Sequence, residues 1–279
     1  MQICRETIHR VLRDGYDFLE SSAEIANAVA ATYQAGYDFF RAPLAEKTSN
    51  TLSEDCGFRI TGIEYSQSAE RPDQVESFSA TARDSDLSKL ETEKGRFLYQ
   101  CMRETIDLLE PVAETLAIMF AEEADQGADT ARLRGAFRDW SCLQLNYSRP
   151  SACSAGMINE AHEDGHLLTL ASADGPGLEI QTTEGGFVPA NVGATSLLIM
   201  PGEIAWLLSG GLIRPLYHQV RPERHLHERI ALLYFGDVNP DACSPWVKNK
   251  VNEGVDIVER IKENSSRFGL IGFEQQDDM

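Results

Sequence analysis

The amino-acid sequence predicts a mixed α and β protein whose core is a double-stranded β-helix (jelly roll) with flanking N-terminal and C-terminal helices. Two observations predict this fold class. About eight short apolar segments, most of them separated by turns with Gly or Pro, fill residues 140–236, a pattern typical of antiparallel double sheets. The segments on either side carry apolar residues at helical spacing.

The chain is expected to form a single domain, because no repeat, low-complexity tract or linker interrupts it. Its 279 residues are enough to bury a substantial core. We expect a mainly helical region over residues 1–135, the jelly-roll core over 136–240, and a C-terminal helix and tail over 241–279.

Apolar residues at three- and four-residue spacing predict three helical regions. Residues 2–50 read as helices, with Ser21 and Ser22 as a cap and Pro43 suited to a helix start or break. A long helix is predicted over 88–124, where Pro111 is expected to kink or divide it. A further helix is predicted over 246–268.

Short apolar runs bounded by turn residues predict the strands of the core. They lie at 142–147, 166–171, 178–181, 187–188, 196–200, 205–208, 217–220 and 229–235. Residues 51–85 show no clear periodicity, and the sequence leaves open whether they line a pocket mouth or form a surface loop.

Composition limits the class of partner. The formal net charge of −19 argues against binding to nucleic acid or to an anionic membrane surface, since either needs a basic face. Six scattered cysteines without a CxxC pair, together with the lack of a signal peptide or membrane span in the sequence, favour a reducing cytosol. The oligomeric state cannot be read from the sequence.

The stretch around His162 carries the clearest chemistry. His162 and Asp164 are two residues apart beside a predicted strand, so their side chains are expected to point the same way. His218, in another extended segment 56 residues after His162, is the best third ligand. Two imidazoles and one carboxylate form the facial triad of non-haem Fe(II) oxygenases. These three residues are therefore the predicted metal ligands.

A second feature follows the distal histidine. Arg229 stands 11 residues after His218, at the start of an apolar strand. A buried arginine at the end of a pocket suits a carboxylate, because its planar fork donates two parallel hydrogen bonds. His166 is expected to share the face of Asp164. It either touches the substrate or, as the more ordinary interpretation, has its hydrogen bonds satisfied in the core or by solvent.

As a set, these motifs resemble the isopenicillin N synthase-like Fe(II)/2-oxoglutarate-dependent oxygenases. The family pattern is His-x-Asp, a distal His about fifty residues later, and Arg-x-Ser about ten residues beyond. The resemblance covers residues 20–240 approximately, which leaves no room for the family's first strand. Further matching stretches are Phe39-Phe40…Pro43…Glu46-Lys47, Gly57-Phe58, Asp73-x-x-Glu76-x-Phe78 and Leu145-Asn146-Tyr147.

The resemblance implies an iron-dependent dioxygenase that uses Fe(II), O₂ and 2-oxoglutarate to hydroxylate, desaturate or cyclise a small molecule, with specialised metabolism as a setting by analogy. It implies that Arg229, Asn146 and Tyr147 bind the co-substrate. Family position and strand facing single out the expected substrate contacts, which are Phe58, Arg59, Tyr65, Phe78 and Phe235.

Two departures from the family pattern keep alternatives open. Arg-x-Ser is here Arg229-Ile230-Ala231, and Asn-x-Tyr is here Asn146-Tyr147-Ser148. Both weaken the co-substrate site, although losing one neutral hydrogen bond costs only ~1 kcal/mol. One alternative is an Fe(II) oxidase of the isopenicillin N synthase type, which needs no 2-oxoglutarate. The other is a non-catalytic jelly-roll binding protein.

Overall fold

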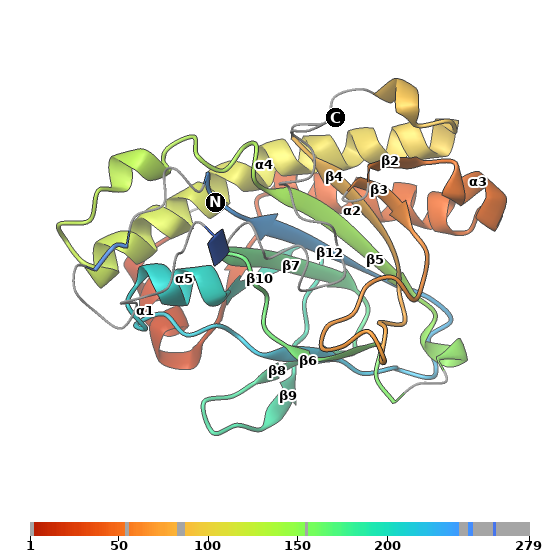
Figure 1. Cartoon of the computed structure of the whole chain (residues 1–279). Helices are drawn as coiled ribbons and strands as arrows, with labels where there is room; N and C mark the ends of the chain where they lie inside the picture. Colours follow the sequence, from red (N-terminus) through yellow and green to blue (C-terminus); the bar gives the residue numbers. More distant parts are fainter. Residues whose placement is uncertain are drawn as a thin grey trace.

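The protein consists of two antiparallel sheets with helices packed on one of them (Figure 1). A computed structural model describes residues 3–53, 56–82, 87–153, 156–239, 245–247 and 259–260. The predicted helix at 246–268 and the tail lie almost entirely outside the described residues. Within the described part of the chain, none of the helices combines the length and the apolar character that a transmembrane segment needs.

The larger sheet has eight strands in the order β1-β10-β7-β12-β5-β4-β3-β2. Its strands are β1 (Asp17–Glu20), β2 (Thr51–Ser53), β3 (Cys56–Arg59), β4 (Glu76–Thr81), β5 (Cys142–Ser148), β7 (Leu168–Asp174), β10 (Ser196–Pro201) and β12 (Arg229–Gly236). The smaller sheet has the order β6-β11-β8-β9. Its strands are β6 (Asn159–His162), β8 (Leu178–Gln181), β9 (Phe187–Pro189) and β11 (His218–Val220).

The helices include two long ones, α2 and α4, which lie against the larger sheet on the side away from the smaller sheet (Figure 1). The helices are α1 (Arg5–Asp14), α2 (Ala23–Phe40), α3 (Leu44–Thr48), α4 (Glu93–Ala124) and α5 (Glu203–Leu208), with short 3-10 turns η1 (Leu87–Lys89), η2 (Thr130–Leu133) and η3 (Pro150–Ala152). The jelly-roll core with flanking N-terminal helices is therefore confirmed.

Local chemistry explains where the long helices begin. The Ser22 hydroxyl accepts a hydrogen bond from the Ile25 amide at 3.3 Å, as predicted for the cap of α2. Thr92 caps α4 through the Gly95 amide at 3.0 Å. Pro111 lies inside α4 without ending it. Buried apolar residues continue along α4 on both sides of Pro111, and their packing offsets the lost backbone hydrogen bond.

Several predicted elements need correction. The run at 205–208 is not a strand but part of helix α5, because four apolar residues in a row fit a buried helix as well as a strand. A first strand is present after all, since β1 pairs with β10 at the edge of the larger sheet. Residues 51–81 add three more strands to that sheet, and the strand predicted at 166 begins at Leu168.

A buried ion pair joins α3 to β4. The Nζ atom of Lys47 lies 2.6 and 2.7 Å from the two carboxylate oxygens of Glu76 and donates to the Phe40 carbonyl at 3.2 Å. Lys47 is only 4% exposed, so solvent cannot replace these partners. The pair connects two stretches that the sequence resemblance had singled out separately.

Replacing Lys47 with methionine is expected to lower the free energy of unfolding by ~3 kcal/mol, because Glu76 would keep a largely buried charge without its partner. Chemical denaturation measures this change. The matched control is Lys94→Met, whose ion pair with Glu46 is long and half exposed and which should cost no more than ~0.5 kcal/mol. Equal losses for the two variants would contradict the structural role given to Lys47.

Candidate metal centre

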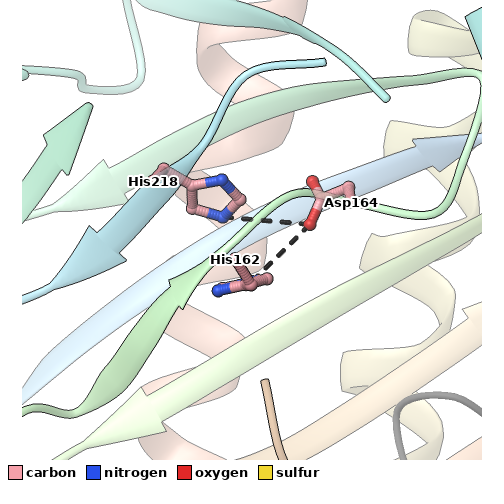
Figure 2. A group of neighbouring side chains, drawn as sticks. All are labelled: His162, Asp164 and His218. Carbon is pink, nitrogen blue, oxygen red and sulfur yellow. Dashed lines mark ion pairs between the residues drawn. The ribbon is translucent and has the colours of Figure 1, made fainter. Parts of the chain in front are cut away.

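Three side chains from different parts of the fold meet between the two sheets (Figure 2). His162 is the last residue of β6 and His218 the first of β11, and the two residues are direct partners in the antiparallel pairing. Asp164 lies in the connection from β6 to β7. The three predicted ligands are thus brought together, with Asp164 outside the strands.

The ligand atoms face one common point. The Nε2 atoms of His162 and His218 lie 3.7 and 3.8 Å from Oδ1 of Asp164, and one ligand atom from each residue falls within 4.8 Å of the others. These separations are too long for hydrogen bonds. The three groups therefore surround a space instead of bonding to one another.

Neighbouring groups hold each ligand in orientation. Nδ1 of His162 lies 2.7 Å from the Glu160 carbonyl, and Nδ1 of His218 lies 3.3 Å from the Leu216 carbonyl. A carbonyl can only accept, so each Nδ1 carries the proton and each Nε2 presents its lone pair. The Thr169 hydroxyl donates to Oδ2 of Asp164 at 2.5 Å, which leaves Oδ1 facing the histidines.

The electrostatics fit a divalent cation. Burial and the neighbouring His162 lower the pKa of His218 to about 4, so its imidazole is neutral at pH 7. Burial opposes the charged form of Asp164, but His218 and His162 outweigh it and leave the pKa of this carboxyl below its usual value. Neutral imidazoles and an ionised carboxylate are the protonation states that metal binding requires.

Gly202 packs closely against the backbone that carries Asp164. A Cβ atom at Gly202 would lie 2.2 Å from the His166 carbonyl oxygen and 2.3 Å from the Asp164 carbonyl oxygen. Both carbonyls accept hydrogen bonds from the first turn of α5, from Glu203 at 3.0 Å and Ile204 at 3.2 Å. The close approach of α5 therefore sets the position of the ligand-bearing backbone.

Gly202→Ala is expected to push this backbone away, lowering metal affinity by ~10-fold or more, as displaced supporting groups typically do. Isothermal titration with Zn²⁺ or anaerobic Fe(II) measures the loss. The control is Gly186→Ala, where a Cβ meets no atom within 4 Å and affinity should not change. Unchanged affinity in Gly202→Ala would show that the ligand segment does not depend on this contact.

A cavity opens beside the three ligands and runs along the inner face of the larger sheet. Of the predicted site residues, Arg229, Asn146, Tyr65 and Phe235 line it together with the triad. Arg229 is 3% exposed, and its Nε donates to the Pro176 carbonyl at 2.9 Å. Its Nη atoms make no hydrogen bond with another described residue.

Three predicted contacts are corrected, because their side chains point to the opposite face of the sheet. The ring of Tyr147 stacks on Phe40 of α2 with centroids 5.0 Å apart. Phe58 and Phe78 are buried in the core around Phe39. None of the three lines the cavity.

Arg59 is buried directly behind the cavity wall. It does not line the cavity itself, but it contacts wall residues, among them Glu64 and Gln144.

Two residues that the sequence places beside the predicted ligands, Ser148 and His166, have contacts that the sequence does not predict. Ser148 lies directly opposite Arg229 on β5, so both side chains project from the same face, and its buried hydroxyl has no hydrogen-bond partner among the described residues. His166 lines the cavity with Nδ1 2.5 Å from Asp237 and its ring stacked on Phe235. The sequence predicts the shared face of Ser148 and Asn146 from strand alternation, whereas the contacts of His166 with Asp237 and Phe235 depend on tertiary structure.

Comparison with known proteins finds a family model that matches the part of the chain carrying this site. Residues 140–237, which include all three metal-ligand candidates and Arg229, match the model of the 2OG-Fe(II) oxygenase superfamily. The match confirms the resemblance that the motifs predicted. Among curated proteins, no sequence is similar enough to count as a relative.

Solved structures share the fold. Neurospora crassa T7H in complex with alpha-KG is 17% identical, with a TM-score of 0.73 over 92% of this chain and 89% of T7H. A Shewanella oneidensis protein described as an oxygenase is 16% identical, with a TM-score of 0.68 over 93% and 94%. Arabidopsis thaliana DAO1 in complex with 2-oxoglutarate is 19% identical, with a TM-score of 0.65 over 85% and 88%. At these identities the likeness establishes the jelly-roll fold.

Proposed function

We propose that this protein, whose residues 140–237 match the 2OG-Fe(II) oxygenase superfamily, is such an oxygenase, holds Fe(II) with His162, Asp164 and His218, and oxidises a small molecule. Fe(II) with 2-oxoglutarate and O₂ supplies the oxidation of a C–H bond, coupled to conversion of the oxo-acid to succinate and CO₂. The observation that carries the proposal is the set of three oriented ligands at the edge of a cavity that also contains Arg229.

Arg229 is proposed to bind the distal carboxylate of 2-oxoglutarate. The Pro176 carbonyl holds its Nε, while the Nη atoms remain available for a planar, two-bond contact with a carboxylate. Burial lowers the pKa of Arg229, but a guanidinium keeps its charge at neutral pH. A buried cation of this kind needs an anionic partner, which the co-substrate provides.

The hydroxyl lost at Ala231 has a proposed replacement. Ala231 lines the cavity and offers only a methyl group next to Arg229. Ser148 stands opposite Arg229 with a buried hydroxyl that lacks a partner among the described residues. A bound carboxylate would satisfy that hydroxyl, so the two departures from the family pattern do not remove the co-substrate site.

The ligands seen in proteins of similar structure support a small-molecule substrate. T7H of Neurospora crassa has been seen with thymine and with 5-formyluracil, and a JOX2 structure contains 2OG, Fe and JA. By the same analogy we propose hydroxylation, desaturation or cyclisation of a small molecule, in specialised metabolism. We also propose that residues 1–279 work as one oxygenase domain, since T7H aligns along 92% of the chain.

An anaerobic titration tests the proposal. The metal-free protein is titrated with Fe(II) and then with 2-oxoglutarate, while the visible charge-transfer band of an oxo-acid bound to iron is followed. We expect a saturable band, and succinate after admission of O₂. Tight iron binding without the band would instead support the Fe(II) oxidase that needs no 2-oxoglutarate, which Ala231 would then explain.

A further inference from the structure

One wall of the cavity is a continuous hydrogen-bonded network. It is formed by Glu64, by Ser79 on β4, and by Gln144 and Asn146 on β5, with Arg59 on β3 behind them. Arg59 donates through Nη2 to the Ser79 hydroxyl and to Oε1 of Gln144, both at 2.7 Å. The wall is therefore fixed before any ligand enters.

The network dictates which way each amide points. Nε of Arg59 donates to Oε1 of Glu64 at 2.5 Å, and Oε2 of Glu64 accepts from Nε2 of Gln144 at 2.9 Å. An arginine can only donate and a carboxylate can only accept, so Gln144 must turn its oxygen to Arg59 and its NH₂ group to Glu64. The arginine and the glutamate thus leave Gln144 one orientation.

Gln144 in turn orients Asn146. The second N–H of Gln144 Nε2 donates to Oδ1 of Asn146 at 2.8 Å. Asn146 consequently directs its NH₂ group elsewhere, and Nδ2 makes no hydrogen bond with another described residue. Asn146 is partly exposed and lines the cavity. Its Nδ2 atom is not among the buried polar atoms that lack a hydrogen-bond partner. The wall therefore presents a fixed hydrogen-bond donor to whatever occupies the cavity.

The charges around the cavity do not favour an anionic substrate. Among the described lining residues Arg229 is the only lysine or arginine, whereas Glu64, Asp73, Asp164 and Asp237 are carboxylates. Arg59 offsets Glu64, and His166 is the partner of Asp237 at 2.5 Å. The charges of iron, Asp164, 2-oxoglutarate and Arg229 sum to zero. Asp73 is 7% exposed and accepts hydrogen bonds from Ser66, and it forms no ion pair with a lysine or arginine in the described part of the chain. An anion entering the loaded site would meet no spare positive charge.

We propose that the substrate is an uncharged small molecule with a carbonyl-type oxygen, which accepts a hydrogen bond from Nδ2 of Asn146. The inference rests on the proposed function, because bound iron and 2-oxoglutarate enter the charge balance. It assigns Asn146 to the substrate, in place of the co-substrate role that the sequence resemblance implied. Glu64 and Gln144 act as positioning residues for Asn146.

The test uses matched pairs of probes that differ in one charge. Protein loaded anaerobically with Fe(II) and 2-oxoglutarate is titrated with benzamide and benzoate, nicotinamide and nicotinate, and indole-3-acetamide and indole-3-acetate. Ligand-detected NMR on Zn²⁺-loaded protein and the shift of the charge-transfer band report binding without turnover. We expect at least one carboxamide to bind, and the matching carboxylate to bind with an affinity lower by ~10-fold or more.

Two variants separate the donor from the charge. Asn146→Ala should lower the affinity for the carboxamide by ~5-fold or more, in line with one lost hydrogen bond, while the charge-transfer band of bound 2-oxoglutarate persists. Asp73→Asn should reduce the difference in affinity between each carboxamide and the matching carboxylate. A carboxylate that binds as well as its carboxamide, an Asn146→Ala variant that binds the carboxamide normally, or binding of neither member of any pair would overturn the inference. Absence of the 2-oxoglutarate band in wild-type protein would instead contradict the proposed function.

Discussion

His218→Ala is expected to reduce metal affinity by at least ~100-fold and to abolish succinate formation, since changes to residues that only support metal ligands already cost 10–100-fold. The remaining His162 and Asp164 would give the metal one nitrogen and one carboxylate. Metal content after dialysis and calorimetric titration measure the loss, and circular dichroism checks that the variant is folded.

The control for this prediction is Gln219→Ala. Gln219 follows His218 in the same strand, but its side chain bonds to Glu179 and does not line the cavity. This variant should keep both metal binding and turnover. His162→Ala and Asp164→Ala should match His218→Ala, and combining two of them should add little, because residues that act as a unit are not additive. A folded His218→Ala protein that retains iron and activity would mean that the metal site lies elsewhere.

Arg229→Ala is expected to lower the affinity for 2-oxoglutarate by ~100-fold or more while leaving the affinity for Fe(II) unchanged. Two charge-assisted hydrogen bonds to a buried carboxylate would be lost, at ~1.5–3 kcal/mol each. Arg229→Lys should lie between wild type and alanine, because lysine keeps the charge but not the planar fork. The titration of the anaerobic charge-transfer band gives the affinity of each variant.

Arg221→Ala serves as the control for this second prediction. Arg221 is more than half exposed, pairs with Glu179 outside the cavity, and should not affect the co-substrate. Loss of 2-oxoglutarate binding in Arg229→Ala with normal iron binding would assign the distal carboxylate. If a folded Arg229→Ala protein binds 2-oxoglutarate as tightly as wild type, the buried guanidinium has another partner.

The metal ligands could be predicted from sequence because their signal is local. His162 and Asp164 lie two residues apart in front of an apolar run, and this spacing keeps them close in almost any extended backbone. The third ligand followed from the fold class, since a jelly roll brings distant strands together. Asp164 lies in the connection between β6 and β7 and not in a strand, yet the side chains still converge.

The substrate side of the site could not be predicted as well, because pleat alternation must be known residue by residue. Asn146 and Tyr147 are neighbours in β5, so only one of them can face the cavity. Phe58 and Phe78 are direct partners in neighbouring strands and therefore both face α2. Strands β1 to β4 are short, and their pairing becomes visible only when the sheet is assembled.

Buried polar groups were the hardest to foresee. The family resemblance predicts Arg59 as a substrate contact, whereas no sequence pattern indicates its partners Glu64 and Gln144. Along the chain, Glu64 is 5 residues from Arg59, and Gln144 is 85 residues from it. No periodic pattern reports such a contact, because it depends on how the loop after β3 folds back over β4 and β5.

The division of the ligands between the two sheets has a mechanical consequence. His162 and His218 belong to the smaller sheet, whereas Asp164 leads into β7 of the larger one and is held there by Thr169. A bound ion would therefore act as a cross-link between the sheets, and its removal would let the smaller sheet open independently. Amide hydrogen exchange should consequently accelerate in β6, β8 and β11 when the metal is withdrawn, while β5, β7 and β12 keep their protection.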